Sequence, residues 1–408
     1  MDTTVSKTRI AEEFDRARVA TDALLEPLSD AELRRQVSPL QSPLVWDYAH
    51  IAYFEELWLA RGVGGADPIM SGHDDIYDAF QHARDERGEL PLLDPASARA
   101  YATDVRARTL EVLDRIELDR DDPLHRDGFV FGMVLQHELQ HQETLLQTLQ
   151  LRDEPYPIPD GSATNGAVHP DSIELLVGGG VITLGTSVEP WAYDNERQAH
   201  ELELPDFRID SEPVTNARYL EFVLAGGYEN ASVWSGAGWA WRVAENVKLP
   251  LNWRRDGDEI TRVRFGHVEP LPPNEPVQHV SFFEAEAFAR WAGKRLPTEQ
   301  EWEKAALSVG PSREHGNRAT FGPRPAVATA PQLGGDVWEW TSSHFLPYPG
   351  FAAFPYAEYS EVFFGDAFRV LRGGSWATDP LVARPTFRNW DYPQRRQIFA
   401  GFRCASDA

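Results

Sequence analysis

The sequence predicts two domains of different fold class: an N-terminal α-helical bundle and a C-terminal α+β domain. A chain of 408 residues, 42% of them hydrophobic, is long enough to build two cores. Apolar residues recur at helical spacing up to about Arg152, and short β-like runs appear only later. Between them lies a proline-rich stretch without periodicity. We therefore expect a bundle over 1–152, a linker over 153–172 and a second domain over 173–408.

Four long helices account for the first domain. Each begins near a capping residue or a proline in its first turn, as at Pro43 and Pro95, and turn residues cluster between them. The stretch 62–94 is too long for a simple bundle connection, and long loops in compact domains are often functional. The predicted helices run from Val5 to Leu28, Ser42 to Arg61, Pro95 to Ile116 and Phe129 to Leu151.

The second domain is predicted to combine short strands with helices. The runs IELLVGG, VITLG and ELELPDFRID have strand character, and helical patterns extend from Asn216 to Leu224 and from Ser281 to Ala292. The glycines 178–180 lie between two short apolar runs and lack the spacing of a dinucleotide-binding loop. This pattern favours a hairpin turn over a phosphate-binding loop.

Charge and cysteine content exclude several classes of function. With 39 basic and 64 acidic residues the net charge is −25, so we expect neither nucleic acids nor anionic membranes as partners. A single cysteine, Cys404, excludes internal disulfides and cysteine-rich metal sites. No apolar signal core or membrane-length stretch is present. These features predict a cytoplasmic protein, and they leave its oligomeric state open.

Histidines in two predicted helices indicate a metal site. In LQHELQHQETLL, His137 and His141 are four residues apart and project from one helix face. His50 lies within the apolar helix WDYAHIAYFEELWL, where an unpaired imidazole is costly to bury. A metal would supply its partner, although a hydrogen bond to a backbone carbonyl is an alternative. Glu138 and Glu143 point away from the histidine face, so a carboxylate ligand is not obvious.

The identity of the metal stays open at this point. The spacing HExxxH is one residue wider than the HExxH motif of zinc proteases. Three imidazoles on an octahedral ion leave three positions for substrates and O2, which suits redox-active iron(II). Spacing alone therefore favours iron over zinc without excluding zinc.

Longer motifs resemble a known enzyme family. SPLVWDYAHIAYFEELWLARG, FGMVLQHELQHQETLLQTLQLR and TFRNWDYPQRRQIFAGFR are similar to the ergothioneine-type sulfoxide synthases. GGDVWEWTSS and RVLRGGSW are similar to the second domain of that family. The resemblance spans nearly the whole chain. It implies a DinB-like four-helix bundle followed by a domain of the formylglycine-generating-enzyme, C-type-lectin-like fold.

The resemblance also implies a reaction and a set of site residues. Family members are non-haem iron enzymes that use O2 to form a carbon–sulfur bond at the imidazole C2 of hercynine, which is trimethylhistidine. By position, His50, His137 and His141 would bind Fe(II). The matching substrate-binding positions are Gln140 for the hercynine imidazole, Asn389 and Trp390 for its carboxylate and trimethylammonium groups, and Arg84, Arg87 and Asp391 for γ-glutamylcysteine.

One departure from the family concerns catalysis. Where related sulfoxide synthases carry a tyrosine that donates a proton, the string DAFRVLRGGSW places Phe368. The family includes a selenoneine synthase branch, which joins a selenosugar to hercynine, and such an enzyme would not need the phenol. We therefore favour a selenium donor. The alternative is an ergothioneine-type sulfoxide synthase that uses γ-glutamylcysteine or cysteine, and the retained Arg84 and Arg87 favour that alternative.

Three other functions are alternatives to this reaction. A thiol dioxygenase is a lesser alternative, because loss of the phenol would leave iron and O2 free to oxidise a bound thiol. A formylglycine-generating oxidase needs paired cysteines, and Cys404 has no pair. A sugar-binding lectin joined to a structural bundle would not need the three histidines for any turnover.

Overall fold

The computed structural model describes residues 6–118, 120–159, 173–310, 320–326 and 331–408. Its contacts divide the chain into two compact units, Met1–Pro157 and Ile158–Ala408, called unit 1 and unit 2 below. Most of the expected linker, 160–172, lies outside the described residues. Its described beginning packs on unit 1, because the buried Tyr156 donates a hydrogen bond to the carbonyl of Leu24 at 2.9 Å.

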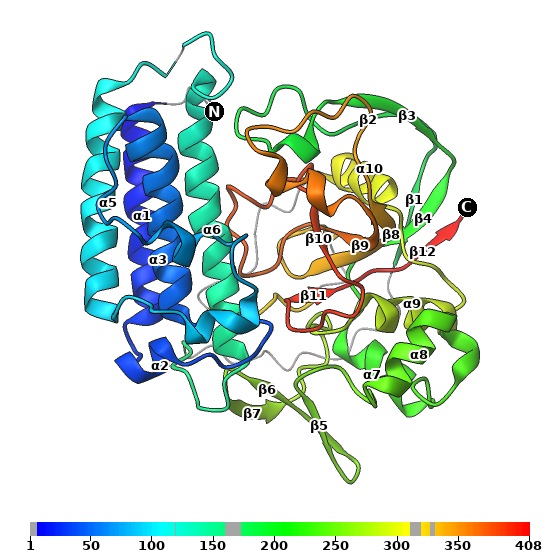
Figure 1. Ribbon diagram of the computed structural model, residues 1–408. Coiled ribbons are helices and arrows are strands. Elements are labelled where there is room, and N and C mark those ends of the chain that lie inside the picture. The colour runs from blue at the N-terminus through cyan, green and yellow to red at the C-terminus, as the bar shows by residue number, and fades with distance from the viewer. Residues whose placement is uncertain (1–5, 119, 160–172, 311–319, 327–330) are drawn as a thin grey trace. The chain divides into compact units, whose positions relative to one another are not determined.

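Unit 1 is the expected bundle, and Figure 1 shows its long helices side by side. Short helices and turns fill the connections between them. The long helices are α1 (Lys7–Leu25), α3 (Leu44–Glu55), α5 (Pro95–Arg115) and α6 (Phe129–Gln150). The shorter ones are α2 (Asp30–Arg34), α4 (Asp74–Tyr77), the π-helical η1 (Glu56–Val63) and the 3-10 turns η2 (Arg84–Glu89) and η3 (Arg126–Gly128).

The ends of these helices follow from local chemistry. The side chain of Ser6 accepts a hydrogen bond from the Arg9 amide, and that of Asp94 accepts one from the Ser97 amide. Helix α6 begins after Gly128, whose φ of +64° lies in the left-handed region that glycine adopts without strain. The α-helical part of the second predicted helix ends at Glu55, and the π-helical η1 continues it past Arg61.

Helix α3 is the centre of unit 1, since all twelve of its residues are buried. Burial of a charged side chain requires a partner. Glu55 finds one in Arg106 of α5, with Nε–Oε1 and Nη2–Oε2 distances of 2.8 and 3.0 Å. Asp47 and His50 of the same helix are also buried.

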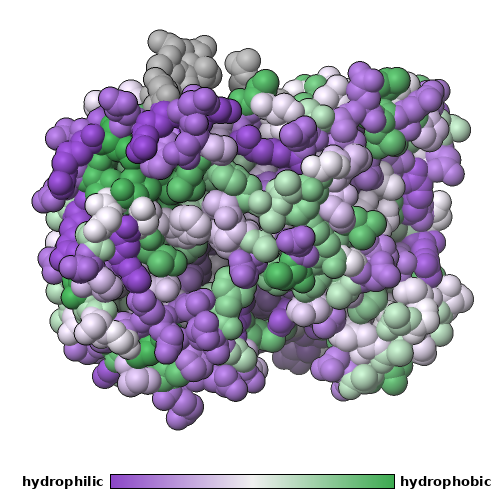
Figure 2. All heavy atoms as spheres, turned by 45° about the horizontal axis from the view of Figure 1, so that its top comes forward, coloured by the Kyte–Doolittle hydropathy of each residue, from purple (hydrophilic) through white to green (hydrophobic). Residues whose placement is uncertain are grey.

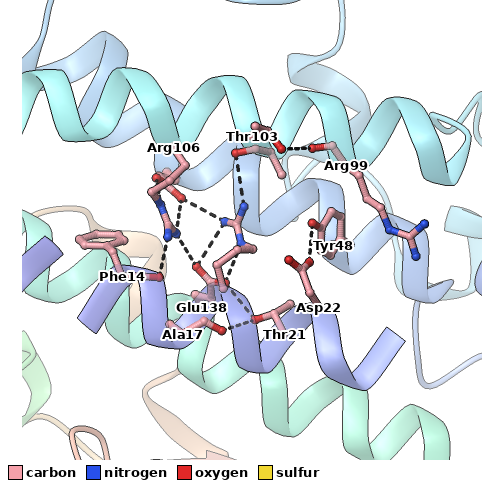
Figure 3. A network of polar contacts seen from close by, with 12 residues as sticks. Phe14, Ala17, Thr21, Asp22, Tyr48, Arg99, Thr103, Arg106 and Glu138 are labelled. Carbon is pink, nitrogen blue, oxygen red and sulfur yellow. Dashed lines mark hydrogen bonds and ion pairs between the residues drawn. The ribbon is translucent and has the colours of Figure 1, made fainter. Parts of the chain in front are cut away.

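A network of ion pairs joins the long helices inside the bundle. Glu138 of α6 lies between Arg18 of α1 and Arg106 of α5, at 2.9 Å from each, and Thr21 donates a hydrogen bond to it (Figure 3). Arg18 also contacts Glu55 at 3.2 Å. Two carboxylates and two guanidinium groups thus compensate one another inside the bundle.

Unit 2 is the expected mixture of strands and helices. Four small sheets have the strand orders β1-β4-β12, β10-β9-β8-β11, β2-β3 and β5-β6-β7. The strands are β1 (Glu174–Val177), β2 (Gly180–Leu184), β3 (His200–Leu204), β4 (Phe207–Asp210), β5 (Trp253–Asp256), β6 (Glu259–Arg264), β7 (His267–Pro270), β8 (Trp338–Phe345), β9 (Gly365–Arg372), β10 (Asn389–Asp391), β11 (Ala400–Gly401) and β12 (Ala405–Asp407).

In the described part of unit 2, four helices accompany these strands. Two of them, α7 and α9, coincide with the predicted ones, and α8 and α10 were not expected. They are α7 (Asn216–Leu224), α8 (Gly236–Ala244), α9 (Phe282–Trp291) and α10 (Glu299–Val309). The 3-10 turns are η4 (Asp194–Glu196), η5 (Ala231–Val233), η6 (Ala357–Tyr359) and η7 (Glu361–Phe363).

The hairpin predicted at the three glycines is wrong. Strand β1 before them pairs with β4, whereas β2 after them pairs with β3, so the glycines link two different sheets. Their small size has another use. A Cβ on Gly179 would lie 2.8 Å from the Leu204 carbonyl oxygen and the Asp206 amide nitrogen, so the backbone approaches the turn between β3 and β4 too closely for a side chain.

Buried arginines fix the strands that carry the predicted substrate residues. Arg388, directly before β10, donates to both carboxylate oxygens of Glu299 at 2.8 and 2.9 Å. Arg372 at the end of β9 contacts Glu303 on the same helix, α10. Both guanidinium groups are fully buried, and each is paired with a carboxylate of α10. Helix α10 therefore anchors β9 and β10 at one end.

Among the described residues no helix has the length and apolar character to cross a membrane. Figure 2 shows hydrophilic residues over much of the visible face, with apolar residues scattered among them.

Candidate functional site

The three predicted histidines meet in unit 1. His50 comes from α3, and His137 and His141 come from successive turns of α6. One ligand atom from each lies within 4.8 Å of the other two. The Nε2 atoms of His50 and His137 are 3.2 Å apart. Among the described residues this is the only group of its kind that could hold a metal ion.

His50 is held by its backbone and aromatic surroundings. Its Nδ1 lies 2.7 Å from the carbonyl oxygen of Tyr77, which can only accept a hydrogen bond. Nδ1 therefore carries the proton and Nε2 presents a lone pair. The indole of Trp46 stacks on the imidazole at 4.7 Å. The carbonyl partner weighed as an alternative to a metal is thus present, on the nitrogen that faces away from His137.

His137 is held by stacking. Its ring lies 3.8 Å from that of Phe54, with an interplanar angle of 15°. Burial, then the charges of His141 and His50, hold its pKa well below the usual range. Burial and His141 do the same to the pKa of His50. Both imidazoles are therefore neutral at physiological pH, which metal binding requires.

The site also contains unsatisfied polar atoms. In the described part of the chain, the Nδ1 atoms of His137 and His141 are buried without a hydrogen-bond partner. The nearest carboxylate to His141 is that of Asp47, whose Oδ1 lies 3.3 Å from Nδ1. Glu138 faces the ion-pair network instead, as expected. Three converging imidazoles, at least two of them neutral, fit a divalent first-row metal such as iron(II) or zinc(II).

The other candidates in unit 1 lie on α6 and η2. Gln140 lies on α6 between His137 and His141 in sequence, half-buried, and its Nε2 donates to the carbonyl of Gln136 at 3.2 Å. Arg84 is exposed, and its Nη1 donates to the carbonyl of Leu40 at 3.2 Å.

Arg87 is buried, unlike Arg84. Its guanidinium group stacks on Trp46 at 3.8 Å and donates to Ser42 Oγ and to the carbonyls of Ala79 and His82. Burial lowers the pKa of Arg87 to about 10. Since Trp46 also stacks on His50, the indole lies in contact with both the guanidinium group and the imidazole.

The predicted substrate residues of unit 2 form strand β10. Trp390 lies in an aromatic cluster, which comprises Phe345, Tyr359, Phe363 and Trp390. The indole stacks on Phe345 at 4.2 Å and meets Tyr359 edge-on at 5.8 Å. Asn389 Oδ1 accepts from the Trp390 amide at 2.9 Å, and Asp391 Oδ1 accepts from the Tyr392 amide at 2.7 Å.

Phe368 lies on β9 beside the same strand. Its ring is 4.4 Å from that of Tyr392 and 5.6 Å from that of Phe363. Tyr392, 39% exposed, therefore places a phenol next to Phe368. Desolvation raises the pKa of Tyr359 and that of Tyr356 above the usual value.

Sequence reasoning missed Asp47, Trp46, Tyr77 and Tyr392. Asp47 and Trp46 precede His50 by one helical turn, so helical spacing was a usable signal for both. Tyr392 directly follows the string NWD. Tyr77 acts through its backbone carbonyl, for which no side-chain signal exists.

Comparison with known proteins places both units in described families. Residues 13–145 match the DinB superfamily, and residues 162–323 and 321–408 match the sulfatase-modifying factor enzyme 1-like domain. A formylglycine-generating enzyme from Streptomyces coelicolor is 32% identical over 62% of this chain and 96% of its own length.

Other relatives match along their whole length. The hercynine oxygenase of Mycolicibacterium smegmatis is 48% identical over 99% of this chain and 100% of its own. That of Mycobacterium tuberculosis is 46% identical over 98% and 99%. Because these matches cover both units, the chain is an oxygen-dependent oxidoreductase that belongs to the hercynine oxygenase family.

Proposed function

We propose that this enzyme binds iron(II) through His50, His137 and His141 and uses O2 to join hercynine to a chalcogen donor at the imidazole C2. The observation that carries the proposal is the convergence of three ligand atoms within 4.8 Å, at a site where His50 directs its Nε2 lone pair inward. Bound iron(II) would supply the one-electron chemistry that O2 needs. The names of the full-length relatives support hercynine as the substrate.

The overall reaction balances as follows. The C2–H bond of hercynine and the X–H bond of the donor break, where X is selenium or sulfur, and a C–X bond forms. O2 accepts four electrons: two from formation of the C–X bond and two from oxidation of X. One oxygen atom stays on X as a selenoxide or sulfoxide, and the other leaves as water with the two protons.

We assign the groups of hercynine one by one to residues at the positions that match the family. The aromatic cluster around Trp390 suits a trimethylammonium group, because such a cation cannot donate hydrogen bonds and is attracted to ring faces. We assign Asn389 to the carboxylate. We assign Gln140, between the two histidine ligands on α6, to the imidazole.

For the donor we propose a selenosugar, as in selenoneine synthesis. Phe368 lacks the proton of a tyrosine, and a sulfoxide synthase of the usual type would need one. The contacts of Arg87 add support, because its N–H groups are already bound to Ser42, Ala79 and His82 rather than exposed to a carboxylate. A neutral sugar donor requires no such arginine.

The alternative donor is a thiol, γ-glutamylcysteine or cysteine, with Arg84 and Asp391 at its charged groups. The specific observation that favours it is Tyr392, whose ring contacts Phe368 and could replace the missing phenol. A thiol dioxygenase remains the lesser alternative. We place the reaction in the cytoplasm, since the single cysteine, Cys404, is buried and no disulfide is needed.

Product analysis tests the function directly. The protein is loaded with iron(II) without oxygen and mixed with hercynine and 1-selenoglucose, γ-glutamylcysteine or cysteine in parallel. Air is then admitted and the products are identified by mass spectrometry. A selenium adduct only with the selenosugar supports the proposal. A sulfoxide adduct with a thiol would assign the sulfur donor, and sulfinate alone would assign a dioxygenase.

Two histidine variants provide the control. His137→Ala should abolish adduct formation with every donor. His73→Ala should retain it, since His73 lies outside the three-histidine site and its Nδ1 contacts the carbonyl oxygen of Ser71. Full activity of His137→Ala would refute the metal site.

A further inference from the structure

A buried carboxylate lies beside the three histidines. Asp47 of α3 is 2% exposed, and its Oδ1 is 3.3 Å from Nδ1 of His141. The contact has the distance of a hydrogen bond but not its angle, and the Oδ2 of Asp47 has no hydrogen-bond partner in the described residues. Nδ1 of His141 is equally unsatisfied there. Both groups therefore have unused capacity to bind each other.

Arg87 does not account for the position of Asp47. Although the charge of Asp47 opposes the lowering of the Arg87 pKa, the guanidinium group donates to Ser42, Ala79 and His82. Asp47 lies three residues before His50 on α3, and therefore one turn away on the same side of the helix. This position brings the carboxylate to the site from α3, whereas His141 comes from α6.

We propose that Asp47 is a positioning residue that accepts a hydrogen bond from Nδ1–H of His141 and thereby directs the Nε2 lone pair of His141 to the metal. The inference rests on the proposed metal site and extends it by one residue. A metal-bound histidine commonly donates its other N–H to a carboxylate or carbonyl, which fixes the tautomer and ring orientation.

The two neighbouring ligands support this assignment. His50 uses the same arrangement, with the Tyr77 carbonyl as acceptor at 2.7 Å. His137 is fixed instead by stacking on Phe54. With Asp47 on His141, each of the three imidazoles has its own orienting contact. The charge of the acceptor has a further effect. A carboxylate in a low-dielectric interior polarises the imidazole more than a carbonyl does, and Nε2 therefore becomes a stronger ligand for the metal.

The first experiment compares metal binding by matched variants. Asp47→Asn keeps the side-chain size but removes the charge. Glu56→Gln is the control, because Glu56 is also 2% exposed, follows the same helix and binds Ile69 N and Tyr101 Oη rather than a histidine. Titration of the metal-free proteins with Co(II) and Fe(II) gives affinity, and the Co(II) visible spectrum reports coordination.

We expect Asp47→Asn to weaken metal binding about 10- to 100-fold and to change the Co(II) spectrum. Asp47→Glu should restore part of the affinity, and Glu56→Gln should match the wild type. If Asp47→Asn had the affinity and the spectrum of the wild type, the role of Asp47 would be refuted while the proposed metal site would stand. A wild-type protein that binds no metal would overturn the proposed function and this inference with it.

A second measurement needs no variant that has to fold. In wild-type protein with ¹⁵N-labelled histidines and bound Zn(II), the nitrogen shifts identify the tautomer of each ring. We expect His141 to be protonated at Nδ1 and metal-bound at Nε2, with the Nδ1–H proton shifted downfield by its charged acceptor. Metal bound at Nδ1, or an Nε2–H tautomer, would overturn the inference even if Asp47→Asn is unstable.

Discussion

His137 and Glu138 are adjacent in α6 and serve opposite sides of it. The imidazole of His137 faces His50, with the two Nε2 atoms 3.2 Å apart, while the carboxylate of Glu138 lies between Arg18 and Arg106. One residue step turns a helix by about 100°, so neighbours reach different environments. The three-histidine cluster and the ion-pair network of the bundle therefore lie on different sides of one helix.

Replacement of Glu138 tests the network. Glu138→Gln leaves two buried guanidinium groups with less compensation, and we expect the free energy of unfolding to fall by about 3–5 kcal/mol. Chemical denaturation followed by circular dichroism measures it. Glu13→Gln is the control, because its pair with Arg16 lies on the surface and is worth less than about 1 kcal/mol. Equal midpoints for the two variants would contradict the assigned role of Glu138.

Arg87→Lys separates a structural role from donor binding. A lysine cannot reproduce the stacking on Trp46 together with the bonds to Ser42, Ala79 and His82. We expect a loss of about 1–3 kcal/mol in stability, with the KM for the donor changed by less than about threefold. The exposed Arg84→Lys is the control for stability. A KM increase above about tenfold at unchanged stability would instead assign Arg87 to the donor carboxylate.

Trp390 should determine affinity for the trimethylammonium group. Trp390→Leu removes the ring face, and we expect the Kd of hercynine to rise by about 2- to 30-fold. Trp390→Phe should retain most of the affinity. Calorimetric titration without oxygen measures both, with histidine as the ligand that lacks the three methyl groups. An equal loss for histidine and hercynine would show that Trp390 does not recognise the quaternary ammonium.

The stability of unit 2 should depend on pH through His279. This imidazole is buried, and burial lowers its pKa to about 4. The unfolded chain therefore binds the proton first, at the ordinary value of about 6.5. The free energy of unfolding therefore has its full value above the pKa of the unfolded chain, falls as the pH drops through that pKa, and levels off below the pKa of the folded state.

His279→Asn isolates this contribution. Asparagine tolerates the φ of +61° at this position and does not titrate. We expect the wild type to lose about 2 kcal/mol more stability between pH 7 and pH 5 than the variant does. Tryptophan fluorescence follows unit 2, since 11 of the 13 tryptophans lie there. Identical pH profiles would exclude His279 as the titrating group.

The long helices could be predicted because their signals are local. Asp94 and Pro95 mark the start of α5, and the apolar spacing of α6 continues to its last turn. Two short helices of unit 2 were missed. Helix α8 begins with GAG, which lowers helical propensity, and the capping box of Thr298 and Glu301 at α10 was not used as a start signal. Strand pairing of β1 with β4 is non-local, so the glycines between β1 and β2 suggested the wrong partner.

The candidate site likewise combines features with local sequence signals and features that depend on non-local packing. The spacing of His137 and His141 within one helix predicted that both imidazoles project from one face, and they converge there with that of His50. The contact of Asp47 with His141 joins α3 to α6, and the contact of His50 with Tyr77 uses a backbone atom. Neither follows from residue type or spacing, because both depend on how the helices pack.

The complete burial of α3 limits which positions can change. One helix of twelve residues supplies a histidine of the three-histidine cluster, its aromatic neighbour, a carboxylate beside a second histidine and an anchor of the ion-pair network. A mutation that adapts one of these contacts disturbs another, since no residue of the helix faces solvent. Laboratory evolution toward new donors should therefore succeed with libraries at Phe368, Trp390 and Tyr392 and fail with libraries in α3.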